Sequence, residues 1–350
     1  MVPPMLLALL ACTEPPPTSS PCPPGPGEIL VLETGANYLW LDKAIGSGTG
    51  FRTVCLGEGV YETELELQEL ESGLLRGRLA LVGAGSDRSS LVGVGEDPWV
   101  LRVASDLHLE GLRFELPVRV EGLSLELHDV AVADFTSEAL PARFEGLEGL
   151  SVTDLALSGL EFPGRALELD AGEEAEDLQI QGLSLLGLRS SSGELAAFEH
   201  AAVVQDLLVL DNVALTNAPG AAGLSTARLE LSGATLSGNE LNGPVLAPAG
   251  PFEGRDIELR GNLSRVLGAL SLLHEGALRD SAILDNSGGS GALSMVFVEP
   301  DREVLLEAVD LGEDSLDNSP CDVGLNTVCL PLELGYVEAM ECSAAGCEEL

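Results

Sequence analysis

Aromatic residues are scarce in this chain of 350 residues: Phe, Trp and Tyr together make up 4% of it, although 45% is hydrophobic. A core must therefore be built from Leu, Val, Ala and Ile, which suits a narrow interior repeated many times along the chain. Few rings are left for stacking on sugars, because the only Trp and Tyr residues are Trp40, Trp99, Tyr38, Tyr61 and Tyr336.

Positive charge is also scarce. Lys and Arg number 17 against 57 Asp and Glu, which gives a formal net charge of -40, and Lys43 is the only lysine. A nucleic-acid-binding protein needs clustered basic residues to contact phosphates, so nucleic acid is excluded as a partner. An anionic membrane surface would repel the same charge.

Long hydrophobic runs are missing, and no segment is long enough to span a bilayer as a helix. The short apolar run within residues 1–11 suits a signal peptide, and Leu9-Leu10-Ala11-Cys12 resembles the lipobox of bacterial lipoproteins. That resemblance implies lipidation of Cys12, with an ordinary secretory signal as the alternative. Residues 12–28 are rich in Pro, Ser and Thr and predict an extended tether. We therefore expect export, with an anchor in the outer membrane or a place at the cell surface or in the periplasm of a Gram-negative-type bacterium.

The six cysteines other than Cys12 contain no CxxC pair and have no histidine nearby, which disfavours a zinc site. In an exported chain an even number of cysteines predicts disulfides. A Cys22–Cys55 bridge at one end and two bridges in a cysteine-rich cap over 318–350 are the simplest pairing, although spacing alone leaves the connectivity open. The cap cysteines are Cys321, Cys329, Cys342 and Cys347.

The region between the two cysteine groups repeats. Ten copies of the pattern apolar-x-apolar-x-x-apolar-x-apolar begin between Leu79 and Val304, about 25 residues apart on average. Each copy holds two short alternating runs, which is the periodicity of strands, and the second run is out of phase by one residue. A corner between the runs would let both face one interior.

A corner of this kind needs residues that tolerate left-handed backbone angles, which are Gly, Asn and Asp. Nine of the ten copies have such a residue at the predicted place, and the tenth has Ala308. The predicted corner residues are Gly83, Gly111, Asp129, Asp154, Gly182, Asn212, Gly233, Gly261 and Asn286.

A third apolar run follows each copy, as in VRVEG at 118, ARFEG at 142 and VLAPAG at 245. Three strands per coil resemble the right-handed parallel β-helix of the pectin-lyase-like superfamily. LDKAI at 41–45 resembles the short capping helix of that family, and residues 53–67 and 79–93 resemble its opening strands and first coil. The resemblance covers 29–317 and implies an all-β solenoid of about ten coils. A leucine-rich repeat has a similar period, but its motif needs Asn or Cys where Leu112, Val130 and Leu155 stand here.

Catalytic residues are not apparent. Enzymes of the superfamily act on acidic polysaccharides with clustered carboxylates and a basic residue, and none of their local signatures occurs. His108 and His128 lie in adjacent copies but at different positions of the pattern, which disfavours a metal pair, and His200 and His274 lie further away. Two acidic segments, 168–177 and 310–322, offer oxygen ligands for Ca²⁺, and the alternative is a solvated acidic loop. The calcium candidates are Asp170, Glu173, Asp310, Asp314 and Asp317.

These observations predict a non-enzymatic surface scaffold or a binding and adhesion module, with an extracellular carbohydrate or protein as ligand. The alternative is a polysaccharide lyase or hydrolase, which rests on the resemblance of fold alone. No cofactor is expected apart from the calcium considered above.

Overall fold

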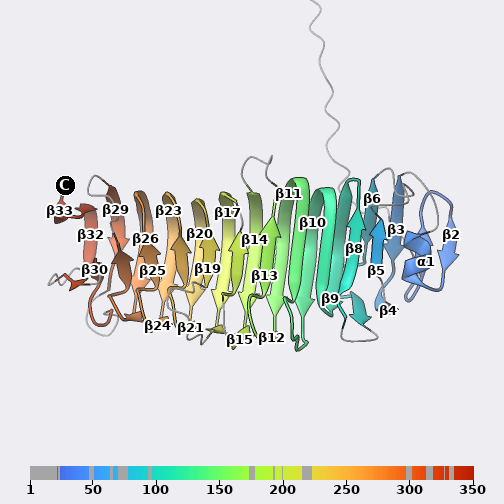
Figure 1. The fold of residues 1–350 in the computed structure, drawn as a ribbon, viewed down its shortest axis with the longest axis horizontal. Coiled ribbons are helices and arrows are strands. Elements are labelled where there is room, and N and C mark those ends of the chain that lie inside the picture. The colour runs from blue at the N-terminus through green and yellow to red at the C-terminus, as the bar shows by residue number, and fades with distance from the viewer. Residues whose placement is uncertain are drawn as a thin grey trace, which may run out of the picture.

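The computed structural model describes residues 22, 24–46, 51–63, 66–69, 78–93, 97–172, 178–191, 194–198, 200–214, 223–296, 302–312, 318–326, 328–330 and 335–350. The chain forms an all-β parallel solenoid of about nine turns, close to the ten that the repeat predicts (Figure 1). At about 4.8 Å per turn, nine turns give a rod roughly 43 Å long. The predicted signal peptide and Cys12 lie outside the described residues, as does most of the 12–28 tether.

Most coils contain one long strand that bends in its middle, which gives two arms on two faces of the solenoid. Neighbouring arms pair in register, and the pairing skips one residue per strand at the bend. These bent strands are β9 (Leu107–Glu115), β10 (Val118–Ala133), β11 (Ala142–Ser158), β14 (Leu178–Leu186), β17 (Ala202–Leu210), β20 (Leu229–Ser237), β23 (Phe252–Arg260), β26 (Gly276–Leu284) and β29 (Glu303–Asp310). In the first coils separate strands supply the arms: β3 (Arg52–Leu56), β4 (Gly59–Thr63), β6 (Leu79–Val82) and β7 (Ser89–Gly93).

The third apolar run of each repeat forms the third face. Its strands are parallel and continue the first parts of β10 and β11. They are β5 (Glu66–Glu69), β8 (Trp99–Val103), β13 (Leu167–Asp170), β16 (Ala196–Phe198), β19 (Leu224–Thr226), β22 (Leu246–Pro248), β25 (Leu270–Leu272), β28 (Leu293–Met295) and β30 (Val323–Leu325). Strands in this position rule out the leucine-rich repeat, which would place a helix or a 3₁₀ turn there.

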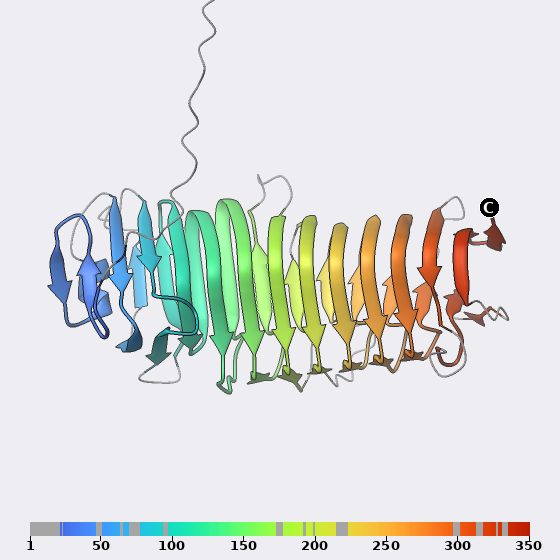
Figure 2. The same ribbon diagram turned by 180° about the vertical axis from the view of Figure 1, so that it is seen from behind.

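A separate sheet of two-residue strands runs along one long edge of the rod (Figure 2). Its strands are β12 (Glu161–Phe162), β15 (Arg189–Ser190), β18 (Val213–Ala214), β21 (Glu240–Leu241), β24 (Leu263–Ser264) and β27 (Ser287–Gly288). The core enclosed by the faces is mainly Leu, Val and Ala, with the largest fully buried side chains at Trp99, Phe114, Phe144 and Phe252.

The bend of each long strand is a residue with positive φ, between 48° and 74°. Only residues that tolerate this region fit without strain, and aspartate or glycine fills every position of the column except the last. The column comprises Gly111, Asp129, Asp154, Gly182, Asp206, Gly233, Asp256, Asp280 and Ala308. Six of the ten residues at the predicted corner therefore lie at this bend.

The other four predicted corner residues lie elsewhere. Gly261 belongs to a second column of positive φ, at the far end of the second arm, and Asn212 and Asn286 directly follow members of it. The prediction was wrong at these three positions because apolar and polar residues alternate in the same way along both arms. The pattern was therefore matched to the second arm in three copies, and the true bend residues, Asp206, Asp256 and Asp280, were missed. The second column comprises Asp134, Gly159, Gly187, Asp211, Gly238, Gly261 and Asp285.

Gly83 is the fourth exception, and it does not have a left-handed φ. A Cβ built on Gly83 would lie 2.1 Å from the carbonyl oxygen of Gly111. Glycine is needed at this place because two backbones approach closely, and not because the chain turns there.

Five asparagines form a buried ladder inside the solenoid, next to the second column. In the first four, Nδ2 donates both to a backbone carbonyl and to the Oδ1 of the asparagine one coil further on, at 2.8–3.2 Å. Each Oδ1 also accepts the backbone N–H of the residue one coil before it. The ladder comprises Asn212, Asn239, Asn262, Asn286 and Asn318, and Asn318 donates to Asp322 at 3.1 Å.

Both ends of the solenoid are closed by antiparallel strands. At the N-terminal end β1 (Ile29–Val31) pairs with β2 (Ala36–Tyr38) and β3, and α1 (Leu41–Ile45) packs on β1, β2 and β4. Leu41, Ala44 and Ile45 bury one side of the helix, which is the capping helix that the sequence predicts. At the other end β32 (Tyr336–Ser343) covers β29, β33 (Gly346–Glu349) pairs with β32, and β31 (Val328–Cys329) pairs with β30.

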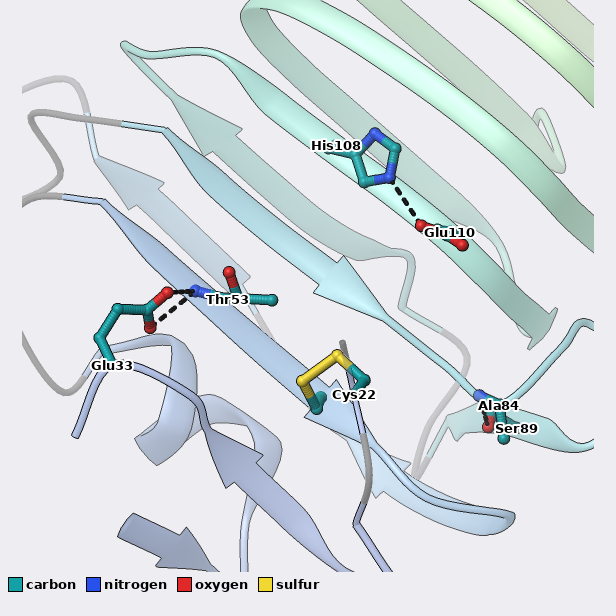
Figure 3. The surroundings of a disulfide bond; sticks show 8 residues. Cys22, Glu33, Thr53, Ala84, Ser89, His108 and Glu110 are labelled. Atoms are coloured by element: carbon teal, nitrogen blue, oxygen red, sulfur yellow. Dashed lines mark hydrogen bonds and ion pairs between the residues drawn. A yellow bond between two sulfur atoms is a disulfide. The ribbon is translucent and has the colours of Figure 1, made fainter. Parts of the chain in front are cut away.

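Disulfides fasten both closures. Cys22 is bonded to Cys55 in β3 (Figure 3), and the C-terminal cap holds the Cys321–Cys329 and Cys342–Cys347 bonds. The Cys342–Cys347 bond joins register partners of β32 and β33. Beside Cys55, the Glu33 carboxylate accepts the Thr53 backbone N–H at 2.9 Å, which ties the cap to β3. Edge strands that would otherwise be open to pairing with other chains are thereby occupied.

Replacing Asp129 with Gly tests the assignment of the bend. Asp129 has φ 51°, which glycine adopts freely, but its carboxylate accepts the backbone N–H of Ser86 at 3.0 Å and the Ser86 hydroxyl at 2.5 Å. We expect Asp129→Gly to lower the free energy of unfolding by about 2–3 kcal/mol, because it removes two partly buried hydrogen bonds to a charged carboxylate. Asp129→Val should cost more, because a β-branched side chain does not fit a left-handed φ. Denaturant melts compare the two, and a loss for Asp129→Val no larger than that for Asp129→Gly would show that the bend is misassigned.

Candidate functional site

The predicted calcium candidates are placed far apart. Asp170 ends β13, where its Oδ1 accepts the Gly172 N–H at 2.9 Å and lies 3.0 Å from His200 Nε2. Asp310 ends β29 and its Oδ1 accepts the Gly312 N–H at 3.0 Å. Glu173, Asp314 and Asp317 lie outside the described residues. Among the residues that the structure describes, no three His, Cys, Asp or Glu side chains are grouped closely enough to hold a metal ion.

His108 lies in a cluster that the sequence did not predict. Its Nδ1 is 3.1 Å from Glu126 Oε2 and its Nε2 is 3.1 Å from Glu110 Oε2 (the latter pair is shown in Figure 3). Arg78 Nη2 also contacts Glu126 Oε2, at 2.8 Å. The register pairs His108 with Glu126 and Glu110 with His128, so the two histidines stand in different columns, as the pattern predicts.

A charged face covers the outside of β8, β10, β11 and β13. Arg102 contacts Glu121 at 3.0 Å, and Arg143 contacts Glu145 at 3.0 Å and Glu168 at 3.3 Å. Burial by itself lowers the pKa of the Arg143 guanidinium, but Glu168 and Glu145 outweigh it and hold the pKa above its ordinary value. These carboxylates are already neutralised by arginine, so they are poor candidates for free acids or bases.

A groove of about 580 Å³ runs across the first arms of β23, β26 and β29, with an extension of about 290 Å³ over β20. It brings together the carboxylates and the basic residues that a polysaccharide enzyme would need. However, Arg279 contacts Glu253 at 2.8 Å and Glu307 at 3.2 Å, and these pairs are solvent-exposed. The pKa of Arg279 is raised, and the largest cause is the hydrogen bond that Arg279 donates to the Glu253 carboxylate. The charge of Arg279 in the groove is therefore also neutralised by neighbouring carboxylates.

A third concave site differs from the other two. This cleft, of about 740 Å³, lies where the sheet of two-residue strands begins, between the 136–138 segment and strands β12, β15 and β18. Its charged side chains are Glu138, Glu161 and Arg189, and all three are exposed. Glu161 and Arg189 are register partners in β12 and β15, yet none of the three forms an ion pair or a side-chain hydrogen bond within the described part of the chain.

The rest of the cleft combines hydroxyls with apolar surface. Thr136, Ser137, Ser190 and Ser191 line it, and Pro163 and Val213 add apolar contact. The Ser190 hydroxyl donates to the Gly164 carbonyl at 2.7 Å, which fixes the wall of the cleft. The volume is in the range of small-ligand sites. The exposed Arg189 donor, the exposed Glu138 and Glu161 acceptors and the apolar surface together can bind a molecule that carries several hydroxyls.

The sequence did not predict this cleft. The only local signal was an arginine, Arg189, directly after the end of a coil in a chain with few basic residues. The other residues that line the cleft come from the 136–138 segment, β12 and β18, and two-residue strands leave no periodicity to detect.

The fold and its two disulfide-bonded closures define the protein as a capped parallel β-solenoid. No protein-family model, no curated protein and no solved structure matches the chain. Among the described residues, no helix is long and apolar enough to cross a membrane.

Proposed function

We propose that the protein is an exported, lipid-anchored protein of the bacterial cell envelope that binds an extracellular carbohydrate without cleaving it. The observation that carries this proposal is the cleft at Arg189, where exposed charged side chains have no partner among the residues that the structure describes. On the charged face Arg102 and Arg143, and in the groove Arg279, are already held by carboxylates.

Carbohydrate is the ligand class that best fits the cleft. Sugar hydroxyls both donate and accept hydrogen bonds, so one sugar unit can use the Arg189 N–H groups, the Glu161 carboxylate and the exposed Thr136 and Ser191 hydroxyls together. The apolar surface of Pro163 and Val213 would contact the C–H face of the ring. A rigid rod closed at both ends presents such a site without refolding, which lowers the cost of binding.

The disulfides support the part of the proposal that concerns location. Such bonds persist in oxidising compartments, and here they fasten both ends of the rod. The apolar run before Cys12 and the Pro-rich tether after it support a lipid anchor.

The test is a binding measurement on the purified chain with a panel of neutral and acidic oligosaccharides, combined with product analysis. We expect binding without new reducing ends or unsaturated products. Arg189→Ala should weaken binding about tenfold or more, because hydrogen bonds from a charged donor are worth about 1.5–3 kcal/mol.

Arg260→Ala is the matched control, because Arg260 is an exposed arginine on the second arm of β23. Within the described residues its one ion-pair contact is a long one, 3.9 Å, to Glu258. This variant should bind like the parent chain. Cleavage of any defined polysaccharide would contradict the proposal and favour the lyase or hydrolase alternative. Equal losses for Arg189→Ala and Arg260→Ala would move the binding site away from the cleft.

A further inference from the structure

The N-terminal end of the rod exposes large apolar side chains. Leu39 is 91% exposed and Trp40 is 60% exposed, and the two are adjacent in the chain between β2 and α1. Phe51, which begins the approach to β3, is 56% exposed. In both views β2 and α1, which precede and follow Leu39 and Trp40 in the chain, lie at one end of the rod (Figures 1 and 2).

The local structure explains why these side chains are not buried. Trp40 is the N-cap of α1 and makes no side-chain capping bond, and the helix turns Leu41, Ala44 and Ile45 toward the core. The core side of the helix is therefore filled without Leu39 or Trp40. An exposed Leu-Trp pair has no role in the packing of this cap and is costly in water.

We propose that this tip, formed by Leu39, Trp40 and Phe51, rests in the interfacial layer of the membrane that carries the lipid anchor. The inference rests on the proposed lipidation of Cys12. It adds that the protein contacts the bilayer through its own surface, and that it stands on its N-terminal end.

The length of the tether supports the membrane as the surface that the tip contacts. Cys22 is fixed to Cys55 in the first coil, so only nine residues, 13–21, separate Cys12 from the folded body. The ten Cα–Cα steps from Cys12 to Cys22 span at most about 35 Å when fully extended, which is less than the length of the rod. The N-terminal tip is therefore held near the bilayer, and a tethered contact acts at an effective concentration of roughly millimolar.

The chemistry of the tip also fits an interface. Tryptophan prefers the boundary between headgroups and hydrocarbon because its ring is apolar and its indole N–H is polar. The net charge of -40 would repel anionic lipid, so the matching surface is zwitterionic lipid.

The chain offers a direct probe, because it has two tryptophans and Trp99 is buried at 1% exposure. Residues 12–350 with the six disulfide cysteines intact can be coupled through the Cys12 thiol to a maleimide lipid in phosphatidylcholine vesicles. We expect Trp40 emission to shift to shorter wavelength and to fall about twofold with brominated lipid, since an interfacial ring contacts the quencher. Trp40→Phe should remove this signal and leave only the Trp99 background.

The double variant Leu39→Ser, Phe51→Ser keeps the reporter and should lose most of the quenching. Val266→Ser is the matched control, because Val266 is 42% exposed but lies far along the rod, and its quenching should equal that of the parent. Unquenched Trp40 on vesicle-bound protein would overturn the proposal. A blue shift that depends on protein concentration without lipid would also overturn it, in favour of end-to-end contact between two copies.

The chemical coupling supplies the anchor whether or not cells attach a lipid to Cys12. Failure of the tip to contact lipid would therefore leave the proposed anchor and the carbohydrate site untouched. Conversely, a chain that is not lipidated in cells would refute the anchor and leave the quenching result standing as a property of the tip alone.

Discussion

Asn239→Leu is expected to lower the stability of the central coils by about 3–5 kcal/mol, because it leaves several buried polar groups without partners. The Asn239 Oδ1 accepts two hydrogen bonds from Asn212, one from the backbone N–H at 3.1 Å and one from the side-chain Nδ2 at 2.9 Å. The Asn239 Nδ2 donates to the Val209 carbonyl at 2.9 Å and to Asn262 Oδ1 at 2.8 Å. Leucine has a similar volume but can replace none of these bonds.

Asn239→Asp distinguishes a hydrogen-bond effect from a packing effect. The aspartate has the same shape, but one of its oxygens would face two acceptors, the Val209 carbonyl and Asn262 Oδ1. We expect a loss at least as large as that for leucine at neutral pH. The folded chain accommodates this carboxyl only when it is protonated, so part of the stability should return as the pH falls.

Denaturant melts with hydrogen exchange at the Asn212 and Asn239 amides measure both variants, because a long repeat does not have to unfold in one step. Ser237→Ala, at a partly exposed residue on the same coil, is the control and should change stability by no more than about 0.5 kcal/mol. If Asn239→Leu proved as mild as Ser237→Ala, the ladder would not be a main source of stability.

The second large effect is expected for Gly83→Ala, at about 3 kcal/mol or more. The new Cβ would meet the Gly111 carbonyl oxygen at 2.1 Å, and also Leu112 Cδ2 and Ser89 Cβ at 2.9 Å each. The closest atom is backbone and is held by the first coils, because the N–H of Gly83 donates to the Glu110 carbonyl at 2.7 Å. Relief of the collision therefore requires two coils to separate.

Gly261→Ala is the matched control, because Gly261 has φ 61° and nothing within 4 Å of a built Cβ. It should cost only the strain of a left-handed alanine, about 1–2 kcal/mol, which Ala308 already bears at φ 54°. Substitution by asparagine separates strain at a left-handed φ from collision with a neighbouring backbone, because asparagine tolerates that φ but still adds a Cβ. Gly261→Asn should be nearly neutral, whereas Gly83→Asn should be as harmful as Gly83→Ala. Thermal and denaturant melts of the four variants give the comparison, and a neutral Gly83→Asn would show that a turn is what Gly83 provides.

Much of the architecture was predictable from the sequence because every coil of a solenoid has the same local structure and therefore needs the same pattern of residues. Alternating apolar residues, a corner type that recurs, and a third apolar run in each copy predicted the parallel coils, and α1 was predicted over its full length. The repeat pattern was matched to the wrong arm at Asn212, Gly261 and Asn286, because apolar and polar residues alternate in the same way along both arms of a coil. An alternation with a period of two residues cannot distinguish one arm from the next.

The candidate sites were less predictable because they depend on what lies beside a residue in other coils. His108 gave no sign that Glu126 and Glu110 would flank it, and Arg189 gave no sign that its register partner Glu161 would stay unpaired. The exposure of Trp40 was equally hidden, because it depends on which side of a five-residue helix faces the core.

By itself the sequence determined the solenoid, the kind of residue at its bends and the composition of its core, because each is set by local periodicity and backbone tolerance. Tertiary structure decided which asparagines stack into a ladder, which glycine is needed for close approach, which cysteines pair, and which charged groups remain without partners. These depend on distances between residues that are one coil or more apart, and such distances are fixed only when the coils are stacked in register.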